Sequence, residues 1–304
     1  MVSWPDLGTR VTVRYRRPAG SVPPLTDALG HLLAVDPLVR VRTKTGAVVE
    51  FSPADVVALR VLTDAPVRAS AIRALEHAAA AAWPGVERTW LEGWLLRAGR
   101  GVTFTVNSAV PLGISAHVSA IPAIVAWYDG RDVTPWLAIP DRLMRPPPGL
   151  ASEHAERVLV RDVSDLSGRE PDPLITLSAR PDDAWLRTHR GEVPVDVLTA
   201  VIDGELAFGA HAGGAVARAA VTDAPDGTRW VGLSALRAAE HRTAAVGRLC
   251  EALLSWGAQR GATRGYLRAH AAGATALAES LGFRLHHRTR YFRATAPGIS
   301  PDSL

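Results

Sequence analysis

The stretch RTAAVGRLCEALLSWGAQRG, residues 242–261, decides how the chain folds, because small residues give way within it to an amphipathic helix. Apolar side chains recur at steps of three and four and share one face, namely Val246, Leu249, Leu253 and Trp256. Gly261 stands just past the last turn, where a left-handed residue commonly ends a helix. We therefore expect a helix that packs one face on a sheet.

The first turn of this helix has two interpretations. Small side chains leave backbone N–H groups uncovered at the positive end of the helix dipole, over Thr243, Ala244, Ala245, Val246 and Gly247. Such an end binds phosphate, and Arg242 and Arg248 flank it with positive charge. The alternative is that alanines merely begin a helix well. The residues alone leave both interpretations open.

Length and composition indicate a soluble protein of about two domains. The chain has 304 residues, of which 47% are hydrophobic and 21% charged. No apolar stretch is long enough to span a bilayer, and the first ten residues lack the pattern of an export signal. Cys250 is the only cysteine, so no internal disulfide can form. We expect a cytoplasmic protein without membrane contact.

The positive net charge says little about which kind of partner the protein binds. The formal net charge is +4, and Lys44 is the only lysine among 34 basic residues. The arginines are scattered and do not gather on one predicted face, which argues against a nucleic-acid partner. Anionic small ligands remain compatible with this charge.

The chain divides into three parts at turn and proline signals. Residues 1–63 hold short alternating strands and predict a small antiparallel barrel. Residues 64–150 predict a helix that ends near Trp83, single strands over 90–98 and 102–111, and a helix over 117–128 with a late start or kink at Pro122. The prolines of RPPPGL, residues 145–150, then indicate a linker.

The third part, residues 151–304, predicts two strands, two short helices and three consecutive strands. The helix described above follows, and then a strand, a further helix and a last strand. The sequence AESLGFRLHHRTRYF, residues 278–292, carries the end of this series.

This order resembles the GNAT superfamily of N-acetyltransferases. In that family a Gln/Arg-x-x-Gly-x-Gly/Ala loop opens the helix after the central strand, and RTAAVG keeps Arg242 and Gly247 but has Ala245 for the first glycine. AAGATALAESLGF keeps Gly282 and Phe283 of a second motif and has Ala278 where the family has tyrosine. The resemblance covers about residues 157–294.

The whole chain also resembles actinobacterial GNAT proteins with an SH3-like barrel ahead of the transferase domain. The resemblance implies an α+β fold, that is, an α/β GNAT fold with a mixed central sheet and helices on both faces, preceded by a small all-β SH3-like barrel. It further implies that residues 64–150 are a middle α/β segment, a candidate reduced GNAT half, between a barrel at 1–63 and an acetyl-CoA-binding core at 151–304.

The resemblance implies a cosubstrate, acetyl-CoA, whose acetyl group moves directly to an amine. Backbone amides of Ala235, Leu236 and Arg237 would hold the pantetheine arm, and residues 242–248 the pyrophosphate. The acceptor is left open between an amine-bearing small molecule and a protein lysine, and a homodimer stays open as well. The alternative function is a catalytically impaired acetyl-CoA sensor or partner-binding module, which Ala245 and Ala278 favour.

The chemistry needs a base that takes a proton from the ammonium group. Glu240, His241 and His270 are the candidates, and histidine titrates near neutral pH. Since Ala278 replaces the usual acid, Tyr266 and Tyr291 are considered in its place, although both could simply pack in strands. We expect no metal, because His286 and His287 are adjacent in a strand and should face opposite ways.

Overall fold

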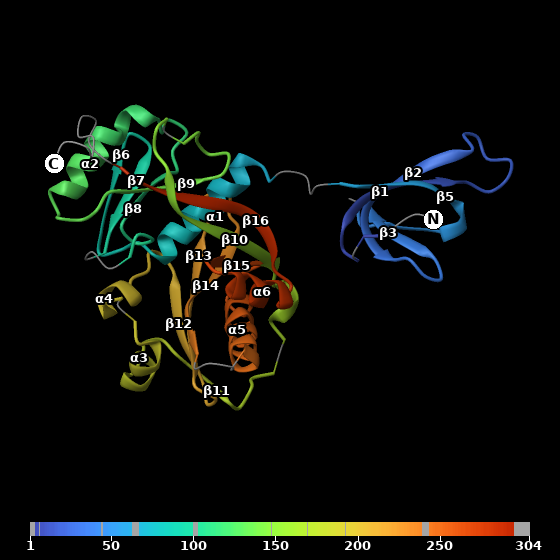
Figure 1. The fold of residues 1–304 in the computed structure, drawn as a ribbon. Helices are drawn as coiled ribbons and strands as arrows, with labels where there is room; N and C mark the ends of the chain where they lie inside the picture. Colours follow the sequence, from blue (N-terminus) through green and yellow to red (C-terminus); the bar gives the residue numbers. More distant parts are fainter. Residues whose placement is uncertain are drawn as a thin grey trace. The chain divides into compact units, whose positions relative to one another are not determined.

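The structure, a computed structural model, describes residues 4–5, 7–43, 45–62, 67–99, 103–146, 148–168, 170–191, 193–238 and 243–294. Its chain forms two compact units, Met1–Pro66 and Val67–Leu304, and each is described by itself (Figure 1). The predicted small all-β domain and the predicted mixed sheet with helices are both confirmed.

The first unit is an antiparallel sheet of five strands in the order β4-β3-β2-β1-β5. The strands are β1 (Arg10–Arg16), β2 (Leu25–Ala34), β3 (Val39–Thr43), β4 (Val48–Phe51) and β5 (Val56–Val61). Its core consists of alternating apolar side chains, namely Val11, Val13, Ala28, Leu32, Val39, Val41 and Phe51. Strand β2 was not predicted, because LTDALGHLLA contains no β-branched residue except Thr26.

The second unit holds a sheet of eleven strands among its described residues, in the order β11-β12-β13-β14-β15-β10-β16-β9-β8-β7-β6. The strands are β6 (Glu87–Leu91), β7 (Trp94–Ala98), β8 (Ser108–Pro111), β9 (Trp136–Pro140), β10 (Ser152–Asp162), β11 (Ile175–Ser178), β12 (Glu205–His211), β13 (Ala215–Asp223), β14 (Arg229–Ala238), β15 (Arg264–Ala269) and β16 (Arg284–Arg293). The helices are α1 (Ala69–Ala82), α2 (Ile121–Asp129), α3 (Asp183–His189), α4 (Val195–Leu198), α5 (Thr243–Ala258) and α6 (Ala272–Ser280).

The succession of parallel and antiparallel neighbours is almost the same whether the sheet is followed from β11 or from β6. Strands β14 and β15 are parallel, as are β8 and β9, and every other pair of neighbours among the described strands of this sheet is antiparallel. Strand β10 follows β9 along the chain but pairs with β15, whereas β16 follows β15 and pairs with β9. Because β10 and β16 also pair with each other, the segments before and after residue 150 share one continuous sheet.

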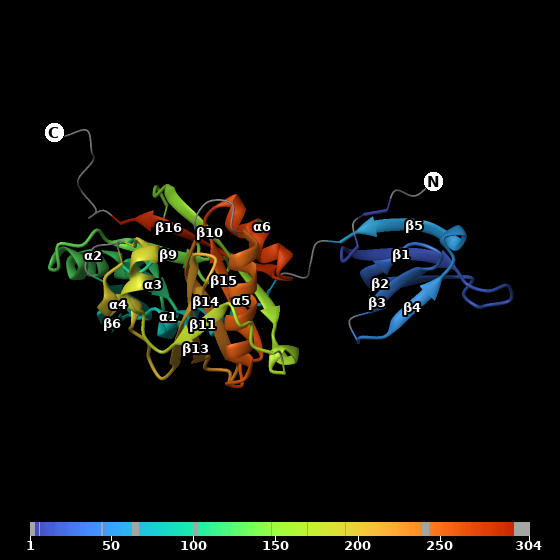
Figure 2. The same cartoon turned by 90° about the horizontal axis from the view of Figure 1, so that it is seen from below.

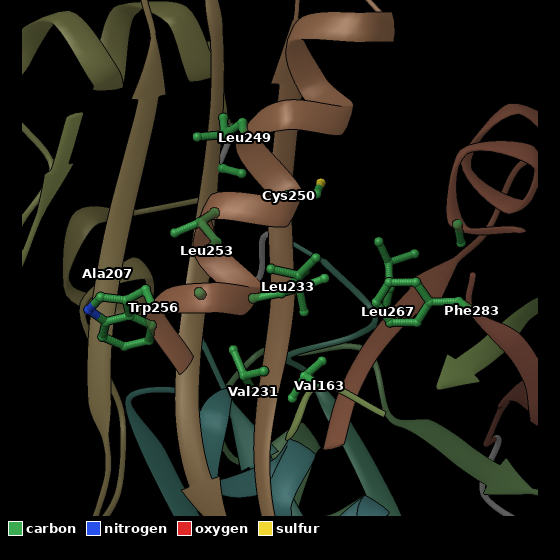
Figure 3. Close-up of a cluster of buried hydrophobic side chains, with 14 of the residues drawn as sticks. Val163, Ala207, Val231, Leu233, Leu249, Cys250, Leu253, Trp256, Leu267 and Phe283 are labelled. Carbon is green, nitrogen blue, oxygen red and sulfur yellow. The ribbon is translucent and has the colours of Figure 1, made fainter. Parts of the chain in front are cut away.

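Helix α5 covers one face of the sheet with the apolar stripe that the sequence predicts. Figure 3 shows Leu249, Leu253 and Trp256 of this helix above Val231 and Leu233 of β14. Helix α6 lies beside α5 near β15 (Figures 1 and 2). On the opposite face α1 packs against β10, β14 and β15, through contacts that include Leu75 with Trp230 and Tyr266. The sheet is therefore enclosed on both faces around β14 and β15.

Two details of the middle segment differ from the sequence-based expectations. Residues 90–98 are not one strand, because Glu92 and Gly93 both have positive φ and form the turn of a hairpin between β6 and β7. Strand β8 is shorter than predicted, because residues 104–106 form a turn before Ser108. The late helix start at Pro122 is confirmed, since Pro122 lies in the first turn of α2.

Candidate functional site

The site begins where two parallel strands part. Strands β14 and β15 pair from Trp230–Arg264 to Leu233–Leu267, and there the ladder ends although both strands continue. Next to this point the pairing of β14 with β13 shifts register, and Ala235 has φ 51°. A bulge of this kind bends a strand away from its neighbour. Residues 234–238 of β14 thus lack a ladder partner on the β15 side.

A cavity of about 780 Å³ occupies the divergence. One wall consists of residues 233–238 of β14 and of Thr243 and Val246 in the first turns of α5. The opposite wall is formed by the end of β15 and the start of α6. The cavity continues to side chains on the α1 side of the sheet, among them Arg97, Glu156, Tyr266 and Tyr291.

The residues predicted to bind acetyl-CoA fall into four groups. Those that line the cavity are Ala235, Leu236, Arg237, Thr243 and Val246. Ala244 is exposed, and Ala245 is buried in the core with its methyl group turned from solvent. Gly247 and Arg248 line a separate cavity of about 330 Å³, in which Arg248 Nη1 lies 3.9 Å from Asp172 Oδ2. Arg242 lies outside the described residues.

Of the predicted catalytic residues, His270 has the surroundings that best fit a general base. It lines the cavity, its side chain is 45% exposed, and its Nε2 atom lies 3.3 Å from Oε2 of the fully buried Glu156. Tyr266 also lines the cavity but is 3% exposed, and burial raises the pKa of its hydroxyl to about 12. Glu240 and His241 lie outside the described residues.

Glu156 belongs to a buried charge network that sequence reasoning missed. Its Oε1 atom accepts hydrogen bonds from Arg268 and from the Tyr291 hydroxyl, the latter at 2.8 Å. Arg268 Nη2 also donates to both oxygens of Glu76 at 2.7 Å, and His287 Nε2 lies 2.8 Å from Glu76 Oε1. Burial opposes ionisation of Glu76, but Arg268 and His287 hold its pKa well below the usual range. The network therefore keeps the carboxylate of Glu76 ionised inside the protein.

One signal in the sequence could have found Glu156. It alternates with Val158 and Val160 along β10, and Val158 packs in the core under α1. A carboxylate at such an inward position must be paired or functional, because burying an unpaired charge is costly. Its partner Arg268 lies in β15, far along the chain, so the sequence does not predict that these two side chains pair.

The histidine pair differs from the sequence-based expectation. His286 and His287 do not face apart, since their Nδ1 atoms lie 2.8 Å from each other. Among the described residues, no group of three or more His, Cys, Asp or Glu side chains is arranged to hold a metal ion. Within the same residues, no helix is both long and apolar enough to cross a membrane.

The position at which the GNAT family has its tyrosine acid offers no proton donor in this chain. Ala278 of α6 is fully buried in the core, and neither Tyr266 of β15 nor Tyr291 of β16 occupies its place. The Tyr291 hydroxyl is already committed to Glu156, and burial together with that carboxylate raises its pKa.

Comparisons with known proteins match both units. The family model described as "Probable histone acetyltransferase Rv0428c C-terminal" matches residues 69–292, and "Rv0428c N-terminal Sm-like domain" matches residues 5–60. A curated protein of Mycobacterium tuberculosis (strain ATCC 25618 / H37Rv), "Probable histone acetyltransferase Rv0428c", is 69% identical over 301 residues, which cover 98% of this chain and 99% of that protein.

A solved structure is similar in fold. The "GCN5-related N-acetyltransferase from Kribbella flavida" superposes with a TM-score of 0.51 at 15% sequence identity, over 79% of this chain and 100% of that chain. At this identity the similarity concerns the fold alone. It agrees with the GNAT resemblance of the sequence, and the small β domain in front is of the Sm-like kind.

Proposed function

The chain belongs to the family of the probable histone acetyltransferase Rv0428c, and from this premise we propose that it is an acetyl-CoA-dependent N-acetyltransferase in which an amine attacks the thioester directly. The observation that carries the proposal is the end of the β14–β15 ladder at Leu233–Leu267, where the cavity opens and reaches His270. An extended thioester arm needs such a gap with strand amides along one wall.

The cosubstrate contacts follow from the two walls. Amides of Ala235, Leu236 and Arg237 line the cavity beyond the ladder and suit the amides and carbonyls of the pantetheine arm. The first turn of α5 supplies backbone N–H groups at the positive end of a helix of sixteen residues, which suits a pyrophosphate. Thr243 at this turn is exposed and lines the same cavity.

We assign the base to His270 and the positioning of its ring to Glu156. Nε2 faces the carboxylate, so the other ring nitrogen is free to accept a proton from the acceptor's ammonium group. The free amine then forms the new C–N bond at the thioester carbon, and the C–S bond breaks, so that the sulfur leaves as thiolate. The attacking nitrogen gives up its second proton to solvent and becomes the amide nitrogen. Tyr266 does not suit the part of base, because a phenol with a raised pKa stays protonated at neutral pH.

A second candidate function rests on Ala278. The fully buried methyl group offers no proton to the departing thiolate, which favours an acetyl-CoA-binding module without turnover. Release of thiol from acetyl-CoA, measured across a panel of small amines and lysine peptides, decides between the two. Binding of acetyl-CoA without thiol release on any acceptor supports the binding module. The name of the Mycobacterium relative suggests a protein lysine as one acceptor class.

We also propose the domain division into residues 1–63, 64–150 and 151–304, with the middle segment a reduced GNAT half. What supports it is the repeated order of elements. Strands β6, β7 and β8, helix α2 and the parallel strand β9 repeat the sequence of β12, β13, β14, α5 and β15. An expressed fragment beginning at Val67 should fold and bind acetyl-CoA, whereas one beginning at residue 151 should not, since it lacks β9 beside β16.

A further inference from the structure

Tyr266 lines the cavity, and its hydroxyl group has no hydrogen-bond partner in the part of the chain that the structure describes. Tyr266 is 3% exposed. Its ring crosses Gly232, its ladder partner on β14, so closely that a β-carbon at that glycine would lie 2.3 Å from the hydroxyl oxygen. Since its pKa is raised to about 12, the phenol keeps its proton and can donate it to a ligand.

Arg97 of β7 lines the same cavity and is also buried. Its guanidinium group donates to the carbonyl oxygens of Trp83 and Thr105, at 3.0 and 3.1 Å, and to the Ser108 hydroxyl at 3.0 Å. None of these partners carries a negative charge, and no described carboxylate forms an ion pair with it. Burial lowers the pKa of Arg97, as expected of a desolvated cation without a counter-charge.

Arg218 of β13 repeats this arrangement on the same face of the sheet. It is 0% exposed and donates to the carbonyl oxygens of Leu198, Ala82 and Ala200, again with no described carboxylate as partner. Burial lowers its pKa to about 10. Burial and the charge of Glu76 raise the pKa of the Tyr266 hydroxyl, whereas Arg268, Arg218 and Arg97 lower it, so the positive charges of all three arginines reach that group.

Arg268 differs from these two arginines, because Glu76 and Glu156 balance its charge. The lining of the cavity therefore offers two kinds of group. His270, backed by Glu156, suits an amine. Tyr266, a hydrogen-bond donor without a partner among the described residues, and Arg97, which has no described carboxylate as its partner, suit an anion.

We propose that the acceptor is a small amine that also carries a carboxylate, with the amine at His270 and the carboxylate accepting a hydrogen bond from Tyr266 in the field of Arg97 and Arg218. This inference rests on the proposed acetyltransferase function. A protein lysine brings an amine with no anion at a fixed distance, so it would leave the Tyr266 hydroxyl without a hydrogen-bond acceptor. The acceptor class is therefore a free amino acid or a similar amino-carboxylate.

Thiol release by the full-length wild-type chain tests this proposal through matched acceptors. Each amino acid of a series with increasing separation of amine and carboxylate is compared with its primary amide, its decarboxylated amine and a lysine-bearing histone-tail peptide. We expect kcat/KM for the best amino acid to exceed that of its amide by about tenfold or more, the worth of one charge-assisted hydrogen bond. Equal values, or a preference for the peptide, would overturn the inference and leave the transferase intact. No thiol release on any acceptor would overturn both.

The variant Tyr266→Phe isolates the hydroxyl, because the ring and its packing on Gly232 are kept. We expect KM for the amino acid to rise about tenfold, with the KM for acetyl-CoA and for the decarboxylated amine unaltered. Tyr15→Phe, in the first unit, is the matched control and should leave all three values unchanged. A Tyr266→Phe enzyme that melts like the wild type and keeps the wild-type KM for the amino acid would contradict the assignment.

Discussion

The Nε2 atom of His270 lies 3.3 Å from Oε2 of Glu156. Glu156 lies in β10, and His270 directly follows Ala269, the last residue of the antiparallel neighbour β15. The carboxylate is fully buried, whereas the imidazole is half-exposed to the cavity. A buried carboxylate behind a histidine fixes the ring orientation and stabilises the imidazolium that forms when the ring takes a proton. The pair thus gives His270 the arrangement of a general base.

Replacement of His270 by glutamine should lower kcat about 100-fold while the dissociation constant of acetyl-CoA stays the same, because the proton acceptor is lost and the thioester arm is held elsewhere. Thiol release and calorimetric titration measure the two quantities. His117→Gln is the control, since His117 is an exposed histidine of the same unit. A His270→Gln enzyme with wild-type kcat would return Glu240 to consideration as the base.

Glu156→Gln tests the positioning role. Glutamine keeps the size but cannot stabilise the imidazolium, so we expect kcat to fall about tenfold or more with little change in KM for acetyl-CoA. Glu156→Asp restores the charge and should recover part of the loss. A merely structural role predicts equal damage from both variants, together with a matching loss of thermal stability.

A negative charge placed at the start of α5 tests the proposed pyrophosphate site. Thr243→Glu places a carboxylate at the exposed start of the helix, where it favours the helix dipole but repels a phosphate. We expect the affinity for acetyl-CoA to fall about tenfold or more while the melting temperature is kept. Thr243→Gln has the same size without the charge and should bind almost as the wild type does. Equal affinities for the two variants would mean that the phosphates lie elsewhere.

The sequence predicted the parts of the fold that local periodicity specifies. The stripe from Val246 to Trp256 is buried as expected, and Gly261 has the expected positive φ of 82°. Ser255 of the same helix is buried although its side chain is polar, and its hydroxyl donates to the Leu166 carbonyl at 2.9 Å. Periodicity places a residue on a helix but does not reveal that a loop folds over it.

The pairing of β10 with β15 and of β16 with β9 could not be predicted from the local sequence. Both strands alternate as any half-buried strand does, and nothing in either sequence specifies its partner. The candidate site depends on this pairing, since it brings Glu156 next to β15 and its Arg268. Sequence reasoning found His270 by residue type and its position near a strand end, but the carboxylate behind it required the tertiary pairing.

Glu76 should matter far more to stability than an exposed carboxylate does. Glu76→Gln leaves Arg268 with one carboxylate and His287 without its charged partner inside the protein, so we expect a loss of about 3 kcal/mol in the free energy of unfolding. Glu87→Gln removes a surface partner of Arg131 and should leave the free energy of unfolding almost unchanged. Urea unfolding of both variants makes the comparison, and similar losses would contradict the importance of the buried network.

The pair His286–His287 predicts that the free energy of unfolding begins to fall near pH 6.5, before the carboxylates titrate. Burial, assisted by repulsion from His287, lowers the pKa of His286 from 6.5 to about 4. Between these values the unfolded chain binds a proton that the folded chain does not, so stability falls as the pH falls from 6.5 towards 4. One pKa unit corresponds to about 1.4 kcal/mol, and partial exposure of the ring reduces the full effect, so we expect a loss of roughly 2 kcal/mol.

His286→Asn should remove most of this dependence, because asparagine does not titrate and can still hydrogen-bond to the neighbouring imidazole. Urea unfolding at neutral pH and at about pH 5 measures the slope for both proteins. Other histidines and the carboxylates contribute equally to wild type and variant and cancel in the difference. His117→Asn, an exposed substitution of the same kind, should keep the wild-type slope. If His286→Asn keeps it too, the acid sensitivity arises from another group.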